Sequence, residues 1–348
     1  MKIVRTLACL AALTLTATQL HAAVVFPVKA YAKPEEPVVV KFVNEKGDEG
    51  KKAVQELGAE AAKLDALFSA APGAEIAGAD GAPLFTLFTA DGKPIKAGNV
   101  KVSPEGTVDL AAAYPTIKDG GTFYLVWKDA PPLVIETLFL PGKNKETLER
   151  LKPQIDQVPA DQKAKVLVQY SPVVTHMEIA QIAIITTDKG VIKAKFSYEY
   201  APHTIDNFTT LARQNFYDNT TFHRILSGFM IQGGDALANS AEGAGMGGPG
   251  YEIMHEFSEK KHERGVLSMA RSSSPDSAGS QFFIMHAKSP NLDTQYSAFG
   301  DVFEGLDVVD AIAKTPADPK SGDVKGPRPK IVSIKILPAT AEIYGLKK

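Results

Sequence analysis

The stretch that most constrains the fold runs from Phe222 to Asp235. It sets one arginine, Arg224, and one glutamine, Gln232, among large apolar side chains and closes on paired glycines. Alternation of side-chain type, interrupted at Ser227-Gly228, predicts two short strands joined by a turn. An arginine that shares a surface with aromatic residues suits a pocket for an apolar ligand with one polar handle. A half-buried hairpin with a salt-bridged arginine is the alternative interpretation.

A second stretch favours the pocket. It comprises Gly265 to Arg271 and Gly279 to Met285. Together, the two stretches closely resemble the cyclophilin family of peptidyl-prolyl isomerases, and the resemblance covers roughly Glu178 to Leu337. It implies a C-terminal eight-stranded antiparallel β-barrel with two capping helices, acting on proline-containing polypeptides.

The resemblance also implies the roles of the site residues. Arg224 is the expected catalytic residue. The resemblance implies that the proline slot is lined by Phe229, Met230, Phe283 and Leu292, and that Gln232 and Gln281 help to hold the substrate and the arginine. The backbone of Ala270 and Arg271 would pair with an extended peptide. His223 and Tyr296 would lie near the site, with His223 more structural than catalytic.

Arg224 fits the chemistry of prolyl isomerisation. Resonance opposes rotation of an amide, with a barrier of about 18–20 kcal/mol. A guanidinium that hydrogen-bonds to the prolyl nitrogen can do so only when the bond is twisted, so it stabilises the transition state over both ground states. The charge of arginine is not lost by deprotonation, and neighbours such as Gln232 can fix its planar fork.

The sequence contains only partial matches to the motifs of dinucleotide-binding proteins, zinc proteases and serine hydrolases. Gly243 to Gly248 matches G-x-G-x-x-G, but no apolar strand precedes it and no helix follows. His255-Glu256 has no second histidine four residues on, and no serine lies in a G-x-S-x-G elbow. We therefore expect no cofactor and no metal, and a hydrolase is disfavoured.

Three positions depart from the familiar eukaryotic pattern and resemble the bacterial branch of the family. Arg271-Ser272 replaces an asparagine and an alanine, Asn291 replaces a tryptophan, and Tyr296 replaces a histidine. Arg224 and the apolar slot are unaffected. Asn291 cannot supply an indole contact, so weak binding of ciclosporin is expected. Arg271 adds charge at the rim, which favours acidic residues beside the proline.

The first 23 residues resemble a secretory signal peptide. Two basic residues precede an apolar run from Leu7 to Leu15, and the small residues Ala22 and Ala23 follow. The only cysteine, Cys9, lies inside this segment, so the mature protein is expected to have no thiol and no disulfide. No apolar run is long enough to span a bilayer. We expect export to the periplasm or secretion.

The 348 residues are enough for two domains. A net charge of -2 gives no reason to expect nucleic acid or an anionic membrane as a partner, and a monomer is the default. The predicted organisation is a signal peptide at 1–23, a β-rich, sandwich-like domain at 24–142, a connector at 143–176, the cyclophilin-like domain at 177–340 and a tail at 341–348.

Local patterns give the predicted elements of each part. In the first domain they are strands at 38–43, 84–88, 122–127 and 133–140, a helix over 54–68, and Trp127 in the core. The connector contains a helix at 144–157 and a strand at 166–170. The second domain has a hairpin of Glu178 to Thr186 with Val191 to Tyr200, a helix from Thr204 to Asn215 with Thr204 as its N-cap, a helix from Leu306 to Ala313, and a last strand from Ile331 to Ile336.

The predicted function is an exported isomerase that accelerates cis/trans exchange of X-Pro bonds in folding proteins. Uncatalysed exchange takes tens to hundreds of seconds, which is slow enough to limit folding. The rival is a binding or holding module, in which the same slot recognises proline-containing segments and turnover is incidental. In that case the N-terminal domain would supply a docking or chaperone surface.

Overall fold

A computed structural model describes residues 23–32, 36–46, 68–139, 173–238 and 244–346. Several predicted features lie outside these ranges. They are the signal peptide with Cys9, the connector helix at 144–157, the strand at 166–170, and the helix over 54–68 apart from Phe68, which begins a strand.

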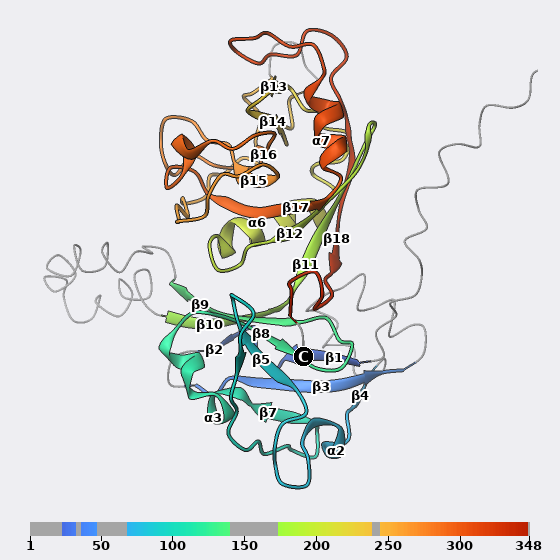
Figure 1. The fold of residues 1–348 in the computed structure, drawn as a ribbon, viewed down its shortest axis with the longest axis vertical. Coiled ribbons are helices and arrows are strands. Elements are labelled where there is room, and N and C mark those ends of the chain that lie inside the picture. The colour runs from blue at the N-terminus through green and yellow to red at the C-terminus, as the bar shows by residue number, and fades with distance from the viewer. Residues whose placement is uncertain (1–22, 33–35, 47–67, 140–172, 239–243, 347–348) are drawn as a thin grey trace, which may run out of the picture.

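The N-terminal part contains two antiparallel sheets (Figure 1). The first is formed by β1 (Ala23–Pro27), β3 (Val39–Glu45), β4 (Phe68–Ala70) and β7 (Thr107–Asp109). The second has the order β2-β10-β9-β8-β5-β6, with β2 (Tyr31–Ala32), β10 (Val173–Ile179), β9 (Leu133–Phe139), β8 (Thr122–Val126), β5 (Thr86–Thr89) and β6 (Pro94–Ile95). Short helices α2 (Gly73–Ile76), α3 (Leu110–Ala113) and η2 (Pro115–Asp119) complete it.

One apolar core joins the two sheets. Phe42 of the first sheet meets Trp127 at the end of β8 edge to face, with ring centroids 5.1 Å apart. The Trp127 Nε1 group donates a hydrogen bond to the Glu75 carbonyl oxygen at 3.0 Å, so its polar atom is satisfied inside the core. The predicted β-rich, sandwich-like arrangement and the core position of Trp127 are confirmed.

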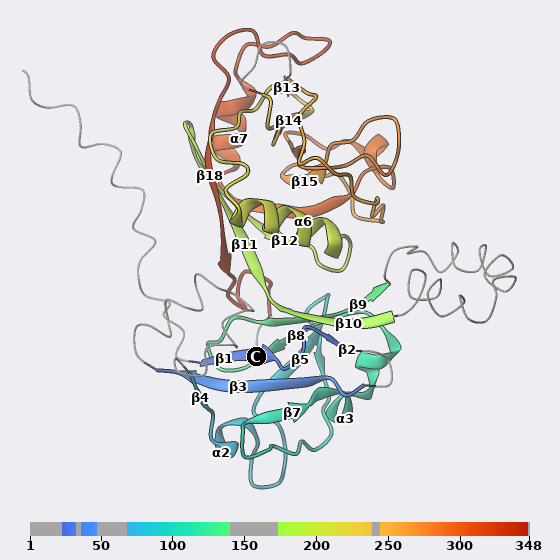
Figure 2. The same cartoon turned by 180° about the vertical axis from the view of Figure 1, so that it is seen from behind.

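The C-terminal part is a curled antiparallel sheet of eight strands (Figures 1 and 2). Its order is β13-β14-β16-β15-β17-β12-β11-β18, with β11 (Gln181–Thr187), β12 (Gly190–Phe196), β13 (Arg224–Leu226), β14 (Met230–Gly233), β15 (Val266–Met269), β16 (Phe282–Met285), β17 (Ala298–Glu304) and β18 (Ile331–Pro338). The segments before β13 and β18 meet through the Phe222 amide, which donates to the Pro329 carbonyl oxygen at 2.9 Å. The predicted eight-stranded antiparallel architecture is confirmed.

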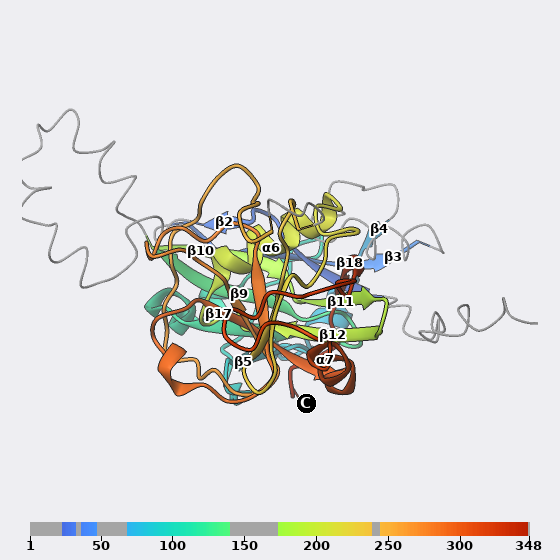
Figure 3. The ribbon, with the colours of Figure 1, turned by 90° about the horizontal axis from the view of Figure 1, so that it is seen from above.

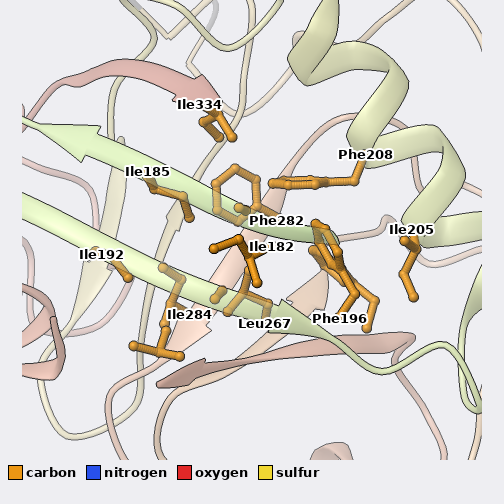
Figure 4. Close-up of a cluster of buried hydrophobic side chains, with 14 of the residues drawn as sticks. Ile182, Ile185, Ile192, Phe196, Ile205, Phe208, Leu267, Phe282, Ile284 and Ile334 are labelled. Atoms are coloured by element: carbon orange, nitrogen blue, oxygen red, sulfur yellow. The ribbon is translucent and has the colours of Figure 1, made fainter. Parts of the chain in front are cut away.

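Alternation along these strands divides the side chains between a core face and an outer face. Phe282 and Ile284 of β16 point into the core with Ile185 of β11 (Figure 4). Phe208 of helix α6 (Pro202–Arg213) contacts Phe282 edge to face at 5.3 Å. Helix α7 (Leu306–Ala313) has the predicted bounds. A further short helix, η3 (Pro290–Leu292), precedes β17.

The N-terminus of α6 differs from the prediction. The helix begins at Pro202, and Thr204 is not its N-cap. Glu256 serves this end instead, because its carboxylate accepts hydrogen bonds from the backbone amides of His203 at 3.2 Å and Thr204 at 2.6 Å. The cap comes from a loop far along the chain, so local sequence gives no sign of it.

The strand predicted from Glu178 to Thr186 is also wrong as a single element. Strand β10 ends at Ile179, in the N-terminal sheet, and β11 begins at Gln181, in the C-terminal sheet. At this break the Gln181 amide donates a hydrogen bond to the Tyr198 hydroxyl at 3.0 Å. The chain therefore passes directly from one sheet to the other.

The two parts pack against each other at this junction, with the C-terminal barrel lying over the N-terminal sheets when viewed down the long axis (Figure 3). After β18 the chain brings Tyr344 between Tyr124 and Tyr198, with ring centroids 5.2 and 6.4 Å away. The Tyr344 hydroxyl donates to the Gln181 carbonyl oxygen at 2.9 Å and accepts from the Phe196 amide at 3.2 Å. The C-terminal segment thus contributes to the junction.

The same junction buries ionisable groups. Burial raises the pKa of Glu178, near the end of β10, to about 8. None of the helices in the described ranges combines the length and the apolar character needed to cross a bilayer.

Candidate active site

The site is built on the β13–β14 hairpin. Arg224 and Gln232 are direct partners in its register. Alternation turns Met230 and Gln232 of β14 to the outer face of the sheet, while Ile231 between them joins the core. The turn places Gly228 at φ +79°, a left-handed conformation that glycine adopts without strain. The predicted strand-turn-strand is confirmed.

A cavity of about 170 Å³ opens beside this hairpin. Its floor belongs to an apolar cluster on the outer face that is separate from the barrel core. The cavity is lined by Arg224, Phe229, Met230, Gln232, Ala270, Arg271, Phe283, Leu292 and Tyr296. Nine of the eleven predicted site residues therefore surround one space.

The Arg224 guanidinium is fixed by two hydrogen bonds. Its Nε group donates to the Ser321 carbonyl oxygen at 2.8 Å, and its Nη1 group donates to Gln232 Oε1 at 3.2 Å. An arginine has five N–H donors, so these two bonds hold the plane of the fork and leave further donors for a ligand. Ser321 lies in the loop after α7, and no sequence pattern pointed to it.

Gln281 does not line the small cavity but connects it with a larger one. Its Oε1 atom accepts from Gln232 Nε2 at 3.0 Å, and its Nε2 group donates to the carbonyl oxygens of Gly245 and Gly247 at 3.0 and 2.8 Å. The second cavity, of about 600 Å³, is bordered by this glycine-rich loop and by Arg271. Gln232 borders both spaces.

A buried polar group supports the slot from behind. The His262 ring stacks on Phe283 with centroids 6.2 Å apart. Its Nδ1 group donates to Asp293 Oδ1 at 3.2 Å, and its Nε2 atom accepts from the Ser268 hydroxyl at 3.0 Å. Burial lowers the pKa of His262, which favours the neutral ring.

This Ser-His-Asp set was missed by the sequence analysis because its members come from separate segments. It has the composition of a hydrolytic triad, but Ser268 is 0% exposed, so its hydroxyl is not accessible to a substrate. The set orients the ring beneath Phe283, and we assign it a structural role.

Arg271 is held at the rim between the two cavities. Its guanidinium lies 4.5 Å from the centroid of the Tyr296 ring and 5.6 Å from that of Phe257. Its Nε and Nη1 groups donate to the carbonyl oxygens of Gln295 and Ser272 at 3.1 and 2.9 Å. The stacking keeps the positive charge over the mouth of the site.

His223 and Asn291 lie apart from the slot. His223 is buried, and neither of its ring nitrogens has a hydrogen-bond partner among the described residues. Burial lowers the pKa of His223, so its ring is held neutral behind the hairpin. Asn291 is exposed in η3 and does not line either cavity.

Known proteins match the C-terminal half. Residues 182–336 fit the family model described as "Cyclophilin type peptidyl-prolyl cis-trans isomerase/CLD". A peptidyl-prolyl cis-trans isomerase from Synechococcus elongatus is 40% identical over 157 residues, which cover 44% of this chain and 95% of that protein. One from Helicobacter pylori is 40% identical over 146 residues, which cover 41% and 82%.

A solved cyclophilin-type isomerase from Cryptosporidium parvum is 34% identical over a match that covers 44% of this chain and 98% of that chain, with a TM-score of 0.41. The family assignment rests on the family model and on the near-complete coverage of the relatives. With its isomerase domain in the C-terminal half, this chain belongs to the cyclophilin family of peptidyl-prolyl cis/trans isomerases.

Proposed function

We propose that this protein accelerates the cis/trans exchange of X-Pro bonds in exported proteins while they fold, with Arg224 as the catalytic residue. The observation that carries the proposal is a guanidinium fixed by Ser321 and Gln232 at the edge of a cavity with an apolar floor. The cavity can hold the proline ring, and the Arg224 guanidinium can donate a hydrogen bond to the amide nitrogen as the bond rotates.

The mechanism follows from where charge appears during rotation. As the X-Pro bond twists, resonance is lost and the lone pair returns to the prolyl nitrogen. Arg224 donates a hydrogen bond to that nitrogen, which accepts it only in the twisted state, so the bond lowers the barrier without stabilising either ground state. One such positioned donor is worth about 10²–10³-fold in rate.

The slot and the adjoining backbone hold the substrate. The ring rests on Phe283 and Met230, which are buried on the outer face of the sheet. The Ala270 amide already donates to the Gln281 carbonyl oxygen at 2.9 Å, so the carbonyl oxygen of Ala270 is the group that an extended peptide reaches. Arg271 at the rim favours an acidic residue next to the proline.

The exported location rests on the signal-like first 23 residues. Folding chains outside the cytoplasm are then the substrates, because slow prolyl exchange limits their folding as it does elsewhere.

A holding module is the second candidate, and the rim of the larger cavity favours it. Met246 is 83% exposed and Tyr251 is 49% exposed there. Exposed apolar side chains beside a cavity suit the capture of unfolded segments. In this alternative, binding of clients is the function and turnover is incidental.

Exchange rates on a short proline peptide distinguish the two. The full mature chain is compared with Arg224→Ala and with Arg264→Ala, a control in which an exposed arginine loses its 2.7 Å ion pair with Asp310 outside the cavity. We expect catalysis to fall in Arg224→Ala and to persist in the control. Unchanged catalysis in Arg224→Ala would reject the mechanism, and client binding without catalysis in the wild type would favour the holding module.

A further inference from the structure

Three potential ligands converge on one face of the second N-terminal sheet, outside the isomerase site. His176 of β10 is the direct cross-strand partner of Glu136 of β9, and Glu178 follows two residues later on the same face. One ligand atom from each side chain lies within 4.8 Å of the others. His176 Nδ1 and Glu136 Oε1 are 2.8 Å apart. The three residues come from neighbouring strands, so the backbone holds them in place.

The face that carries these residues is covered by the C-terminal part. Alternation puts Ile135 and Met177 into the N-terminal core, while Val134 joins the core cluster of the barrel. Glu136, His176 and Glu178 share the side of Val134 and therefore lie at the junction. Glu136 is only 2% exposed. Buried carboxylates are retained where they are paired or bind a metal ion.

Glu178 offers an unused acceptor at this place. Its Oε2 atom accepts from Gln181 Nε2 at 3.0 Å, whereas its Oε1 atom is buried and has no hydrogen-bond partner among the described residues. Asp206 and Arg213 of α6 both act electrostatically on Glu178, and their charges oppose each other. The Arg213 guanidinium bonds to the side-chain oxygen of Gln181. A buried polar atom without a hydrogen-bond partner is costly, and a cation bound to the ionised carboxylate would satisfy it.

We propose that Glu136, His176 and Glu178 bind a divalent transition-metal ion of the Zn²⁺ type at the junction of the two parts of the chain. Imidazole nitrogen and carboxylate oxygen are both ligands of Zn²⁺, and a site with three protein ligands holds a water in the fourth position. Imidazole distinguishes this set from the all-oxygen sites of Mg²⁺ and Ca²⁺.

To bind the ion, the side chains must rotate so that the distant ligand atoms approach and the 2.8 Å contact between His176 Nδ1 and Glu136 Oε1 opens. Ligand atoms bound to Zn²⁺ at about 2.0–2.2 Å are roughly 3.4 Å apart in a tetrahedral site, and the present atoms lie within 4.8 Å of one another. The His176 ring packs on Tyr31 with centroids 4.7 Å apart, which limits its orientation. Tyr31 is 49% exposed, so the ion can enter from solvent past this ring.

Binding would brace the strand through which the chain passes from one part to the other. Strand β10 supplies two ligands and continues through Ala180 into β11 of the barrel. An ion that joins β9 to β10 there stabilises the base from which the barrel emerges. The inference does not depend on the proposed isomerase mechanism.

Direct titration tests the site. The full mature protein, freed of metal by chelation, is titrated with Zn²⁺ by calorimetry and with Co²⁺ by visible absorption, which reports the coordination of the bound ion. We expect one ion per chain, Co²⁺ bands of a four-coordinate site, and a raised thermal unfolding midpoint with Zn²⁺. Absence of one-to-one binding in the folded wild type would overturn the proposal without any variant.

Variants locate the ion. His176→Ala and the nearly isosteric Glu178→Gln should each weaken binding at least tenfold, with folding checked by circular dichroism. The matched control is His255→Ala, which removes a half-buried histidine that pairs with Asp276 at 2.6 Å; it should bind as the wild type does. Binding that survives both junction variants, or that is lost in the control, would show an adventitious surface ion and refute the site. The rate of prolyl exchange is measured on the same metal-free wild type. If exchange is catalysed while no metal binds, the metal site is refuted and the proposed isomerase function stands.

Discussion

Replacing Arg224 by lysine tests the catalytic reasoning more sharply than alanine does, because it keeps the charge and removes the fork. Arg224 is held by Nε, which donates to the Ser321 carbonyl oxygen at 2.8 Å, and by Nη1, which donates to Gln232 Oε1 at 3.2 Å. Lysine has a single ammonium at the end of a flexible stem. It cannot make both bonds and also direct a donor at the prolyl nitrogen.

The expected magnitude follows from the loss of one positioned donor. Such a loss costs about 10²–10³-fold, or roughly 2.7–4 kcal/mol of transition-state stabilisation. The apolar slot formed by Phe283 and Met230 is untouched, so ground-state binding should be retained. We therefore expect kcat to fall while KM stays within a few-fold, which is the pattern for an interaction made only in the transition state.

A second variant tests the positioning of the Arg224 guanidinium without changing its charge. Gln232→Leu leaves the Arg224 guanidinium in place but removes one of its two anchors. A hydrogen bond to a charged group is worth about 1.5–3 kcal/mol, so an intermediate loss of kcat, of about ten- to a hundred-fold, is expected. Exchange rates measured by NMR on a proline peptide over a range of concentrations give both constants, with Arg264→Lys as the surface control. Wild-type kcat in Arg224→Lys, or a loss confined to KM, would refute the reasoning.

Three further changes probe the support of the site and the junction. Phe283→Ala removes a buried ring from the slot floor and should lower the free energy of unfolding by about 3–5 kcal/mol in urea titrations; a loss below about 1 kcal/mol would contradict its packing role. Since burial lowers the pKa of His262, the unfolded chain takes up a proton near pH 6.5 that the folded state refuses. Stability that is fully present above pH 6.5 is therefore lost as the pH falls from that value through the lower pKa of the folded His262 ring. The non-titrating His262→Gln should flatten this acid limb of the melting temperature, and an unchanged limb would assign it to other groups. Tyr344→Phe removes the hydroxyl that bridges the Phe196 amide and the Gln181 carbonyl, so a loss of about 1–3 kcal/mol is expected in urea titrations, and none if water replaces the hydroxyl.

The hairpin of the site could be predicted because its information is local. Alternation and the Ser227-Gly228 turn specify two strands, and the register then places Arg224 opposite Gln232. Helix α7 likewise has the predicted bounds, because the spacing of its apolar residues is a local signal. The residues from distant strands that line the same cavity were predicted from the resemblance to the family, not from local patterns.

The supporting contacts could not be predicted, because each joins segments with no shared local pattern. The Ser321 carbonyl that anchors Arg224 is a backbone group, so its side chain carries no signal. Glu256 caps α6 from a loop about fifty residues away in sequence. The ring under Phe283 depends on His262 and on partners from β15 and from the residue after η3. The periodicity of apolar residues predicts a helix or a strand, but it does not predict which residues from distant segments contact that element.

The passage from β10 to β11 shows how a continuous apolar run can hide a change of sheet. Apolar residues continue on both sides of Ala180 with no turn residue between them, so the sequence reads as one strand. The structure separates them because Met177 and Ile179 fill the N-terminal core, whereas Ile182 and Ala183 belong to the barrel. A fragment that begins at His176 would carry the first pair into solvent without the sheet that buries it. It would also leave Tyr344 without Tyr124 beside it. Loss of activity in such a fragment would therefore reflect a damaged junction, and substitutions at the junction of the full chain are the sounder way to ask what the N-terminal domain contributes.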